Sequence, residues 1–228
     1  MQPTAKPDLT TFLASSAHDM KNSLGMLSGL LEKFLDVHSE SDFSGYKDLA
    51  SMLYETRRIN NDLMHLLTLY KLDHKLYPFH PGCVSLADFF EDLQVQNASL
   101  LISRGIELAF RAEDDLIWYF DEDLILGVIN HAVNNASNYT QNRILIAAEV
   151  VDGMLEIRVE DNGQGYPAFM LDNGHSPLGV DFNRGSTGLG LHFTRTVAAL
   201  HKNKGRSGRL LLQNGGSLGG GVFIIQLP

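Results

Sequence analysis

The sequence predicts an α+β protein, in which an antiparallel helical hairpin over residues 1–77 is followed by an α/β sandwich over residues 78–228. Three observations lead to this prediction. Two apolar runs repeat at the helical spacing of three and four, and a segment rich in proline and glycine follows them. Beyond that segment, strand and helix patterns alternate without a regular repeat. We expect the hairpin to form a dimeric four-helix bundle with a second copy of the chain.

The two apolar runs define the hairpin. The link between them, around His38 to Phe43, is short and polar, so the two helices should lie antiparallel. Two helices cannot enclose a core, and Leu53 and Leu67 widen the second stripe. We therefore expect a homodimer, and the alternative is that the stripe packs on the rest of the same chain. The runs are Leu13, Ala17, Met20, Leu24, Leu27, Leu31 and Phe34, then Leu49, Met52, Thr56, Ile59, Leu63, Leu66 and Tyr70.

The second domain begins where Pro78, Pro81 and Gly82 prevent a helix from continuing. Ser85 and Asp121 are candidate N-caps, and three segments have helical periodicity. Six segments have the alternation typical of strands. The helices are expected at Ser85 to Ile102, Asp121 to Asn138 and Leu189 to His201, and the strands at Ile106 to Phe110, Leu116 to Phe120, Ile144 to Val150, Leu155 to Val159, Leu210 to Leu212 and Val222 to Leu227.

Composition narrows the functional classes. The chain has 228 residues, of which 44% are hydrophobic, and 18 basic and 27 acidic residues give a net charge of −9. This charge argues against nucleic-acid binding through phosphate neutralisation. The single cysteine, Cys83, excludes an internal disulfide and fits a reducing compartment. Apolar runs fall short of the roughly 18 residues that a membrane span requires, so we expect a cytoplasmic protein.

The first candidate site lies on the first helix. His18 is just off the apolar seam and should face solvent, and Asn22 is one turn further on the same face. Asp19 is adjacent and can orient the imidazole or hold its proton. This arrangement suits a nucleophilic histidine, although an ordinary polar helix face is the alternative.

The second candidate site combines a helix with glycine motifs. His131 and Asn135 share a helix face where an amide oxygen can bind Mg²⁺, and Tyr139 can pack against a base. Asp161, before Gly163 and Gly165, can accept a hydrogen bond from an adenine amino group. The segment that contains Gly188, Leu189 and Gly190 opens a helix, and the amides of a helix N-terminus suit phosphate.

These motifs, in this order, resemble those of the sensor histidine kinases. HDMKN contains His18, an N-box ends in Asn135-Ala136-Ser137-Asn138-Tyr139, DNGQG spans 161–165 and GLGL spans 188–191. The resemblance implies a dimerisation and phosphotransfer hairpin followed by a Bergerat-type ATP-binding domain. It further implies that Asn135 binds Mg²⁺, that Tyr139 covers adenine, that Asp161 reads its amino group, and that the glycines form a lid and phosphate site.

Three positions depart from the family pattern. Ser23 replaces a usual proline, His131 stands where an asparagine or acid is common, and Asn138 replaces a phosphate-contacting lysine or arginine. Arg184 is the candidate replacement cation.

The predicted function is autophosphorylation of His18 from Mg-ATP and transfer of the phosphoryl group to an aspartate of a response regulator, with reverse dephosphorylation assisted by Asn22. One alternative is a scaffold with a relic ATP domain. A second is an ATPase of the gyrase and heat-shock chaperone superfamily, against which the His18 motif argues.

Overall fold

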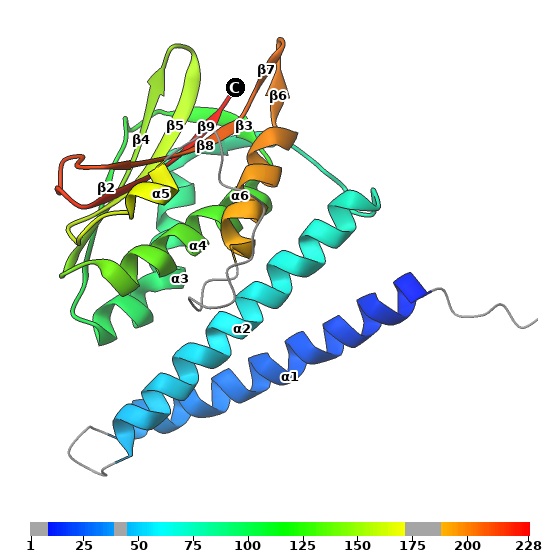
Figure 1. Ribbon diagram of the computed structural model, residues 1–228, viewed down its shortest axis with the longest axis vertical. Coiled ribbons are helices and arrows are strands. Elements are labelled where there is room, and N and C mark those ends of the chain that lie inside the picture. The colour runs from blue at the N-terminus through cyan, green and yellow to red at the C-terminus, as the bar shows by residue number, and fades with distance from the viewer. Residues whose placement is uncertain (1–8, 39–44, 172–187) are drawn as a thin grey trace, which may run out of the picture. The chain divides into compact units, whose positions relative to one another are not determined.

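The computed structural model describes residues 9–38, 45–171 and 188–228. The chain divides into two compact units, Met1–Tyr77 and Pro78–Pro228. The first unit is the expected helical hairpin, made of α1 (Leu9–Val37) and α2 (Tyr46–Asp73), as Figure 1 shows. Within the described ranges, none of the helices has the length and apolar character that crossing a membrane requires.

Packing between α1 and α2 leaves much of the apolar surface uncovered. The Arg57 guanidinium joins the helices by donating to Oε1 of Glu32 at 2.8 Å and 3.2 Å. Among described side chains, those buried in the hairpin are small or polar: Ala17, Ser28, Thr56 and His65. Seam residues spaced seven apart on each helix are 41% to 57% exposed, namely Met20, Leu27, Phe34, Met52, Ile59 and Leu66. Among the described residues of the hairpin, one apolar line is therefore not covered by the packing of α1 against α2.

Buried His65 makes the hairpin sensitive to acid. Burial lowers the pKa of His65 from 6.5 to about 4. The unfolded chain therefore binds this proton at a higher pH than the folded chain, and folded stability falls as the pH drops from 6.5 toward 4. Between pH 7 and pH 5 we expect His65 alone to cost about 2 kcal/mol of unfolding free energy. His65→Leu should remove this part of the pH slope in urea unfolding, whereas His80→Leu, an exposed control, should retain it.

The second unit is built on a five-stranded sheet with the order β2-β4-β5-β9-β8. β2 runs parallel to β4, and the remaining neighbours are antiparallel. A separate antiparallel pair joins β1 (Gly82–Ser85) to β3 (Ile117–Phe120). The strands of the large sheet are β2 (Glu107–Arg111), β4 (Arg143–Val151), β5 (Met154–Asp161), β8 (Arg209–Asn214) and β9 (Gly221–Leu227).

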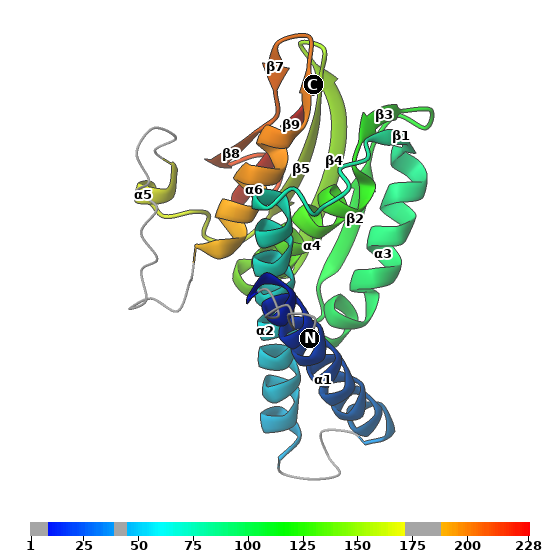
Figure 2. The same ribbon diagram turned by 90° about the vertical axis from the view of Figure 1, so that its right-hand side faces the viewer.

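Three helices cover one face of this sheet, as Figures 1 and 2 show: α3 (Leu86–Ser103), α4 (Glu122–Tyr139) and α6 (Leu189–Leu200). The predicted N-caps are confirmed, because Ser85 Oγ accepts from the Asp88 amide at 3.4 Å and Asp121 Oδ1 accepts from the Leu124 amide at 3.2 Å. The core between helices and sheet contains Phe89, Phe120, Phe223, Ile125, Ile129, Ile157 and Ile225, all fully buried.

The ends of α4 and α6 that lie away from the glycine motifs are tied together at one histidine. Nε2 of His201, just after α6, accepts the backbone N–H of Asp121 at 3.0 Å, and its Nδ1 lies 2.9 Å from the Val197 carbonyl oxygen. Burial lowers the pKa of His201, which favours the neutral ring that this pairing needs. The two helices that carry the second candidate site are thus held in a fixed relation.

Four short elements depart from the sequence expectations. β1 occupies Gly82–Ser85, where we expected only a boundary and a helix cap. α5 (Ala168–Leu171) follows the DNGQG motif. The basic segment after α6 forms a small exposed hairpin of β6 (Lys202–Asn203) and β7 (Arg206–Ser207).

Candidate functional site

His18 projects from α1 with its two polar neighbours at the same ring nitrogen. Its side chain is 66% exposed, the Asn22 amide nitrogen lies 3.2 Å from Nδ1, and an Asp19 carboxylate oxygen lies 3.9 Å from Nδ1. A carboxylate near Nδ1 favours a proton on that atom, and the Asn22 amide can accept the same proton when its oxygen is turned inward. This tautomer leaves the lone pair on Nε2. The predicted grouping of these three residues on one exposed face is therefore present.

Asp161 is the last residue of β5, and the backbone of Gly163, Gly220 and Gly221 lies close around it; we call this arrangement the Asp161 cradle. The residue is 6% exposed, and its Oδ1 accepts the Gly163 amide at 2.7 Å. Its other carboxylate oxygen faces Gly221, where an added Cβ would lie 2.7 Å from Oδ2. The Gly220 amide also donates to the Asp161 carbonyl at 3.0 Å. Only glycine permits this approach, and it leaves Oδ2 as the carboxylate atom that can accept from a ligand.

The C-terminal end of α4 contacts the DNGQG motif at Gly163. A Cβ at Gly163 would lie 2.1 Å from the Tyr139 carbonyl oxygen, so glycine is required at this contact. Tyr139 itself is 72% exposed, so its aromatic ring is largely uncovered. Nearby Tyr166 is half-buried, and desolvation together with the Asp161 carboxylate raises its pKa. An exposed aromatic residue and a buried acceptor therefore belong to two segments that meet at Gly163, and recognition of a purine uses both kinds of group.

Asn162 fixes the loop between α4 and β4. Its Oδ1 accepts the backbone amides of residues 141–143, each at 3.1 Å, and the Thr140 hydroxyl at 2.7 Å. Because Asn162 follows Asp161 directly, this network holds the acid in place relative to Tyr139. The sequence alone does not predict this role of Asn162, since an asparagine within a DNG segment is equally typical of an ordinary turn.

The strand β8 and its following loop clamp the other side of the motif. Asn214 Oδ1 accepts the Tyr166 amide at 2.6 Å, and its Nδ2 donates to the Tyr166 carbonyl at 2.8 Å. Glu160, 2% exposed, accepts both the amide and the hydroxyl of Ser217 at 2.7 Å and 2.6 Å. These pairs join positions 48 and 57 residues apart. No local pattern in the sequence indicates contacts between residues so far apart along the chain.

His131 and Asn135 meet on one face of α4, as their spacing predicts. Nε2 of His131 lies 2.8 Å from the Asn135 amide nitrogen. The ring also packs against Gly190 in the first turn of α6, where an added Cβ would lie 2.0 Å from Nε2. Gly188 begins this helix in the left-handed conformation, with φ of +63°. The GLGL segment therefore begins α6, and its Gly190 packs directly against the His131 ring.

Asn138 is paired with a cation from another helix end. The Arg104 guanidinium, at the C-cap of α3, donates to Asn138 Oδ1 at 2.8 Å and to the carbonyl and hydroxyl of Ser137 at 3.1 Å and 3.2 Å. The expected replacement cation, Arg184, lies outside the described residues. Sequence reasoning missed Arg104, which is 34 positions away.

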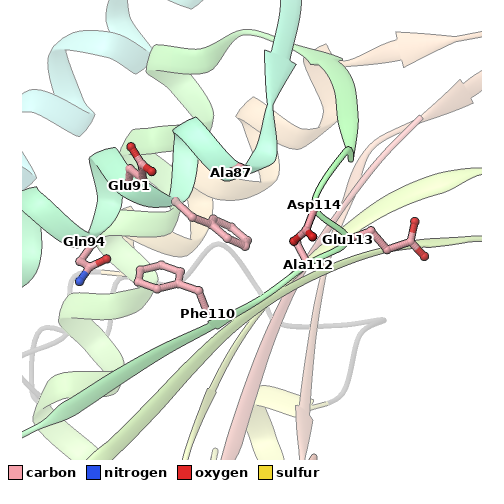
Figure 3. A pocket seen from close by; sticks show the side chains of 8 residues that line it. Ala87, Glu91, Gln94, Phe110, Ala112, Glu113 and Asp114 are labelled. Carbon is pink, nitrogen blue, oxygen red and sulfur yellow. The ribbon is translucent and has the colours of Figure 1, made fainter.

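A hollow of about 230 Å³ lies elsewhere, between α3 and β2 (Figure 3). Phe90 and Phe110 line it, with ring centroids 5.1 Å apart, and Glu91, Glu113 and Asp114 are at its rim. None of the candidate site residues lines this hollow.

Comparisons with known proteins bear on the second unit most strongly. Residues 120–228 match the family described as histidine kinase-, DNA gyrase B-, and HSP90-like ATPase. The chain is 24% identical over 157 residues to the sensor protein SrrB of Staphylococcus aureus, a match that covers 68% of this chain and 27% of that protein. The chain thus spans about a quarter of the length of this relative.

Two solved structures have a similar fold. The histidine kinase AdeS of Acinetobacter baumannii gives a TM-score of 0.59 at 20% identity, covering 92% of this chain and 96% of that one. The catalytic domain of the histidine kinase ThkA gives a TM-score of 0.54 at 22% identity, covering 65% of this chain and 95% of that one. At these identities the similarity concerns the fold.

Proposed function

We propose that this chain, a relative of the sensor histidine kinases whose residues 120–228 belong to the histidine kinase-, DNA gyrase B- and HSP90-like ATPase family, is the phosphotransfer core of a two-component system. It moves the γ-phosphoryl group of ATP to His18 and then to an aspartate of a response regulator. The observation that carries this proposal is an exposed histidine, with both polar neighbours at Nδ1, in the same chain as an ATPase-family domain.

The nucleotide site would use the cradle around Asp161. The carboxylate accepts the adenine amino group at Oδ2, Tyr139 covers the base, and Gly163 and Gly165 let the backbone approach it. The phosphates lie toward the first turn of α6, where Gly188, Leu189 and Gly190 present backbone amides. The tight contacts at Gly163 and Gly221 support this assignment, because a side chain at Gly163 would collide with the Tyr139 carbonyl oxygen and one at Gly221 with Oδ2 of Asp161.

Mg²⁺ would be held by Asn135. The described residues contain no cluster of three or more acidic, histidine or cysteine side chains suited to a metal. An ion here would therefore take most of its ligands from phosphate and water, which is how Mg²⁺ is usually bound with nucleotides. A bound Mg²⁺ would neutralise phosphate charge, and the Asn135 amide oxygen is a ligand of the hard type that it prefers.

Transfer needs positioning more than covalent assistance. With its proton held at Nδ1 between Asp19 and Asn22, the neutral His18 ring attacks the γ-phosphorus through the Nε2 lone pair. The new bond joins nitrogen to phosphorus, the bond to the bridging oxygen breaks, and ADP leaves with that electron pair. His18 and the nucleotide cradle belong to separate units, so transfer depends on an arrangement of the two units that aligns the ring with the γ-phosphate.

A response regulator receives the phosphoryl group on an aspartate. Asn22, one turn from His18, can also orient a water molecule toward a phosphorylated partner once its amide is released from Nδ1. The same helix face would then serve both transfer and dephosphorylation.

The exposed seam predicts a homodimeric four-helix bundle. Ile59→Glu places a charge on the uncovered apolar line of α2, and transferring that charge into an apolar interface is costly. We expect the dimer dissociation constant of the full chain to rise by at least about 100-fold in sedimentation equilibrium. Ala50→Glu, at an exposed position on the opposite side of α2, should leave it unchanged. A wild-type monomer at micromolar concentration would instead favour packing of the seam within one chain.

Arg104 should supply the phosphate-contacting charge that Asn138 lacks. Loss of one charge-assisted hydrogen bond predicts a fall of about tenfold or more in the autophosphorylation rate of Arg104→Gln. Adding Asn138→Lys should restore most of the rate, because it returns a cation to the same place. Arg111→Gln, an exposed arginine of β2, is the control. If Arg104 only caps α4, Asn138→Lys will give no rescue.

The function is tested with ATP labelled at either phosphate. Label from γ-labelled ATP should remain on the protein in an acid-labile, base-stable form, and label from α-labelled ATP should not. A relic ATP domain predicts neither label nor nucleotide affinity. ATP hydrolysis without protein labelling would favour an ATPase of the gyrase and chaperone type.

A further inference from the structure

The hollow between α3 and the end of β2 has an aromatic floor. Phe90 and Phe110 meet there, and Ala87 and Ala112 extend the apolar lining. Phe90 is 6% exposed, whereas Phe110 is half-buried at the end of β2, a strand at the edge of the large sheet. The fold therefore leaves this aromatic surface partly uncovered, and burying it would be favourable.

Carboxylates border this floor on two sides. Glu91 lies with Gln94 on the α3 side, and Glu113 and Asp114 lie on the side of the loop that follows β2, as Figure 3 shows. All four residues are exposed. Within the described ranges, the ion pairs of the second unit engage other acids, and Glu91, Glu113 and Asp114 form none. The rim therefore carries carboxylates whose charge is not neutralised by a described side chain.

The neighbouring residues add to this negative charge. Asp88, Asp92 and Asp115 are exposed and stand one position away from residues that line the hollow. Side chains alternate across a strand, so Arg111, the cation of β2, lies on the opposite face of the sheet from Phe110. A concentration of negative charge beside an apolar surface attracts a cationic partner and repels nucleic acid and anionic membranes.

The volume of the hollow limits what can enter it. Sites for small molecules and cofactors usually enclose about 300–1,000 Å³, whereas this hollow holds about 230 Å³. Protein interfaces commonly centre on one large side chain seated in a pocket, with polar and charged pairs around it. The hollow is therefore better suited to an anchoring side chain of a peptide segment than to a free cofactor.

We propose that this hollow is a docking site for a basic segment of another protein. The segment places one aromatic side chain against Phe90 and Phe110, and its flanking lysine or arginine residues pair with Glu91 and Glu113. Charge complementarity selects this partner, because a basic segment supplies the counter-charges that the carboxylates lack while its anchor covers the rings. None of the nucleotide-site residues lines the hollow, so the docking is separate from the proposed kinase function.

A second copy of this chain fits the hollow less well. The exposed hairpin β6–β7 has the sequence KNKGRS over residues 202–207, which offers Lys202, Lys204 and Arg206 but no apolar anchor. Such a hairpin would be held by charge alone and would leave the aromatic floor uncovered. The chemistry of the hollow therefore points to a different protein, whose basic segment also carries an aromatic residue.

The test uses the full chain and a pair of dye-labelled synthetic peptides as probes. In one peptide a central tryptophan is flanked by arginines, and in the other alanine replaces the tryptophan. We expect the tryptophan peptide to bind at least about tenfold more tightly than the alanine peptide in fluorescence anisotropy. On binding, the amide NMR shifts of residues 86–94 and 110–115 should change, and those around Asp161 should not.

Two variants separate the anchor from the charge. Ala87→Phe, at an exposed position of α3, fills the hollow and should remove most of the difference between the two peptides. Glu91→Gln combined with Glu113→Gln should weaken both peptides by about tenfold at low salt and reduce the salt dependence of binding. The matched control is Glu122→Gln combined with Asp152→Asn, which removes the same charge at exposed acids outside the hollow. It should change either affinity by less than about twofold.

Each contrary result overturns the docking proposal and leaves the kinase proposal standing. Equal affinity for the two peptides, or an equal loss in the double variant and its control, would show attraction to the net charge of −9 alone. Shift changes confined to other segments would place the binding elsewhere. Phenethylammonium binding as tightly as the tryptophan peptide would make the hollow a site for a small cation. The wild-type shifts decide the location even where Ala87→Phe fails to fold.

Discussion

His18→Gln is expected to abolish retention of the γ-phosphoryl group while nucleotide affinity stays within about twofold of the wild type. The acceptor is on α1, and the Asp161 cradle is in the other unit, so the substitution removes the nucleophile and leaves the cradle intact. Glutamine keeps an amide beside Asn22 but has no lone pair able to form the nitrogen-phosphorus bond.

Two measurements check this prediction. Protein-bound label from γ-labelled ATP should fall by at least about 1,000-fold, and the ADP dissociation constant should be measured on the same sample. His80→Gln is the matched control, because His80 is exposed and its backbone amide, which the substitution keeps, donates to Asp121. Labelling of His18→Gln at the wild-type level would show that another residue accepts the phosphoryl group.

Asp161→Asn is expected to weaken adenine nucleotide binding by about 10- to 100-fold, which corresponds to about 1.5–3 kcal/mol for one charged hydrogen bond. The substituted amide can still accept the Gly163 amide through its oxygen. Its NH₂ group then takes the place of Oδ2 and presents a donor toward the adenine amino group, which is also a donor.

Calorimetry with ADP and with GDP checks the role of Asp161. Wild type should prefer ADP clearly, and Asp161→Asn should lose most of that preference. Asp152→Asn is a suitable control, since Asp152 is exposed in the turn between β4 and β5 and its positive φ of 52° suits asparagine. Unchanged ADP affinity in Asp161→Asn would remove this carboxylate from the base site.

Elements whose cause is local could be predicted from the sequence. The helices α3 and α4 begin at Ser85 and Asp121 because each cap acts within three residues. The helical hairpin followed from the repeat of apolar residues, although α1 and α2 extend beyond those runs because polar residues continue a helix equally well. The contact of His131 with Asn135 also follows from one helical turn.

Features that depend on distant partners could not be predicted. β1 has four residues and becomes a strand because it pairs with β3, about 35 positions later in the chain. The clamp of Asn214 on Tyr166 and the pairing of Arg104 with Asn138 likewise join segments with no shared local pattern. The need for glycine at Gly190 depends on the His131 ring, so GLGL could be recognised as a helix start while its contact remained hidden.

Phosphoryl transfer to His18 is measured most directly by mass spectrometry of the full chain after incubation with Mg-ATP, with digestion kept at neutral or alkaline pH because phosphohistidine is acid-labile. Fragmentation that preserves the nitrogen-phosphorus bond should place one phosphoryl group on His18, and brief acid treatment should remove it. A phosphoryl group on serine, threonine or another histidine, or none on a sample that binds ATP, would contradict the proposed histidine kinase function.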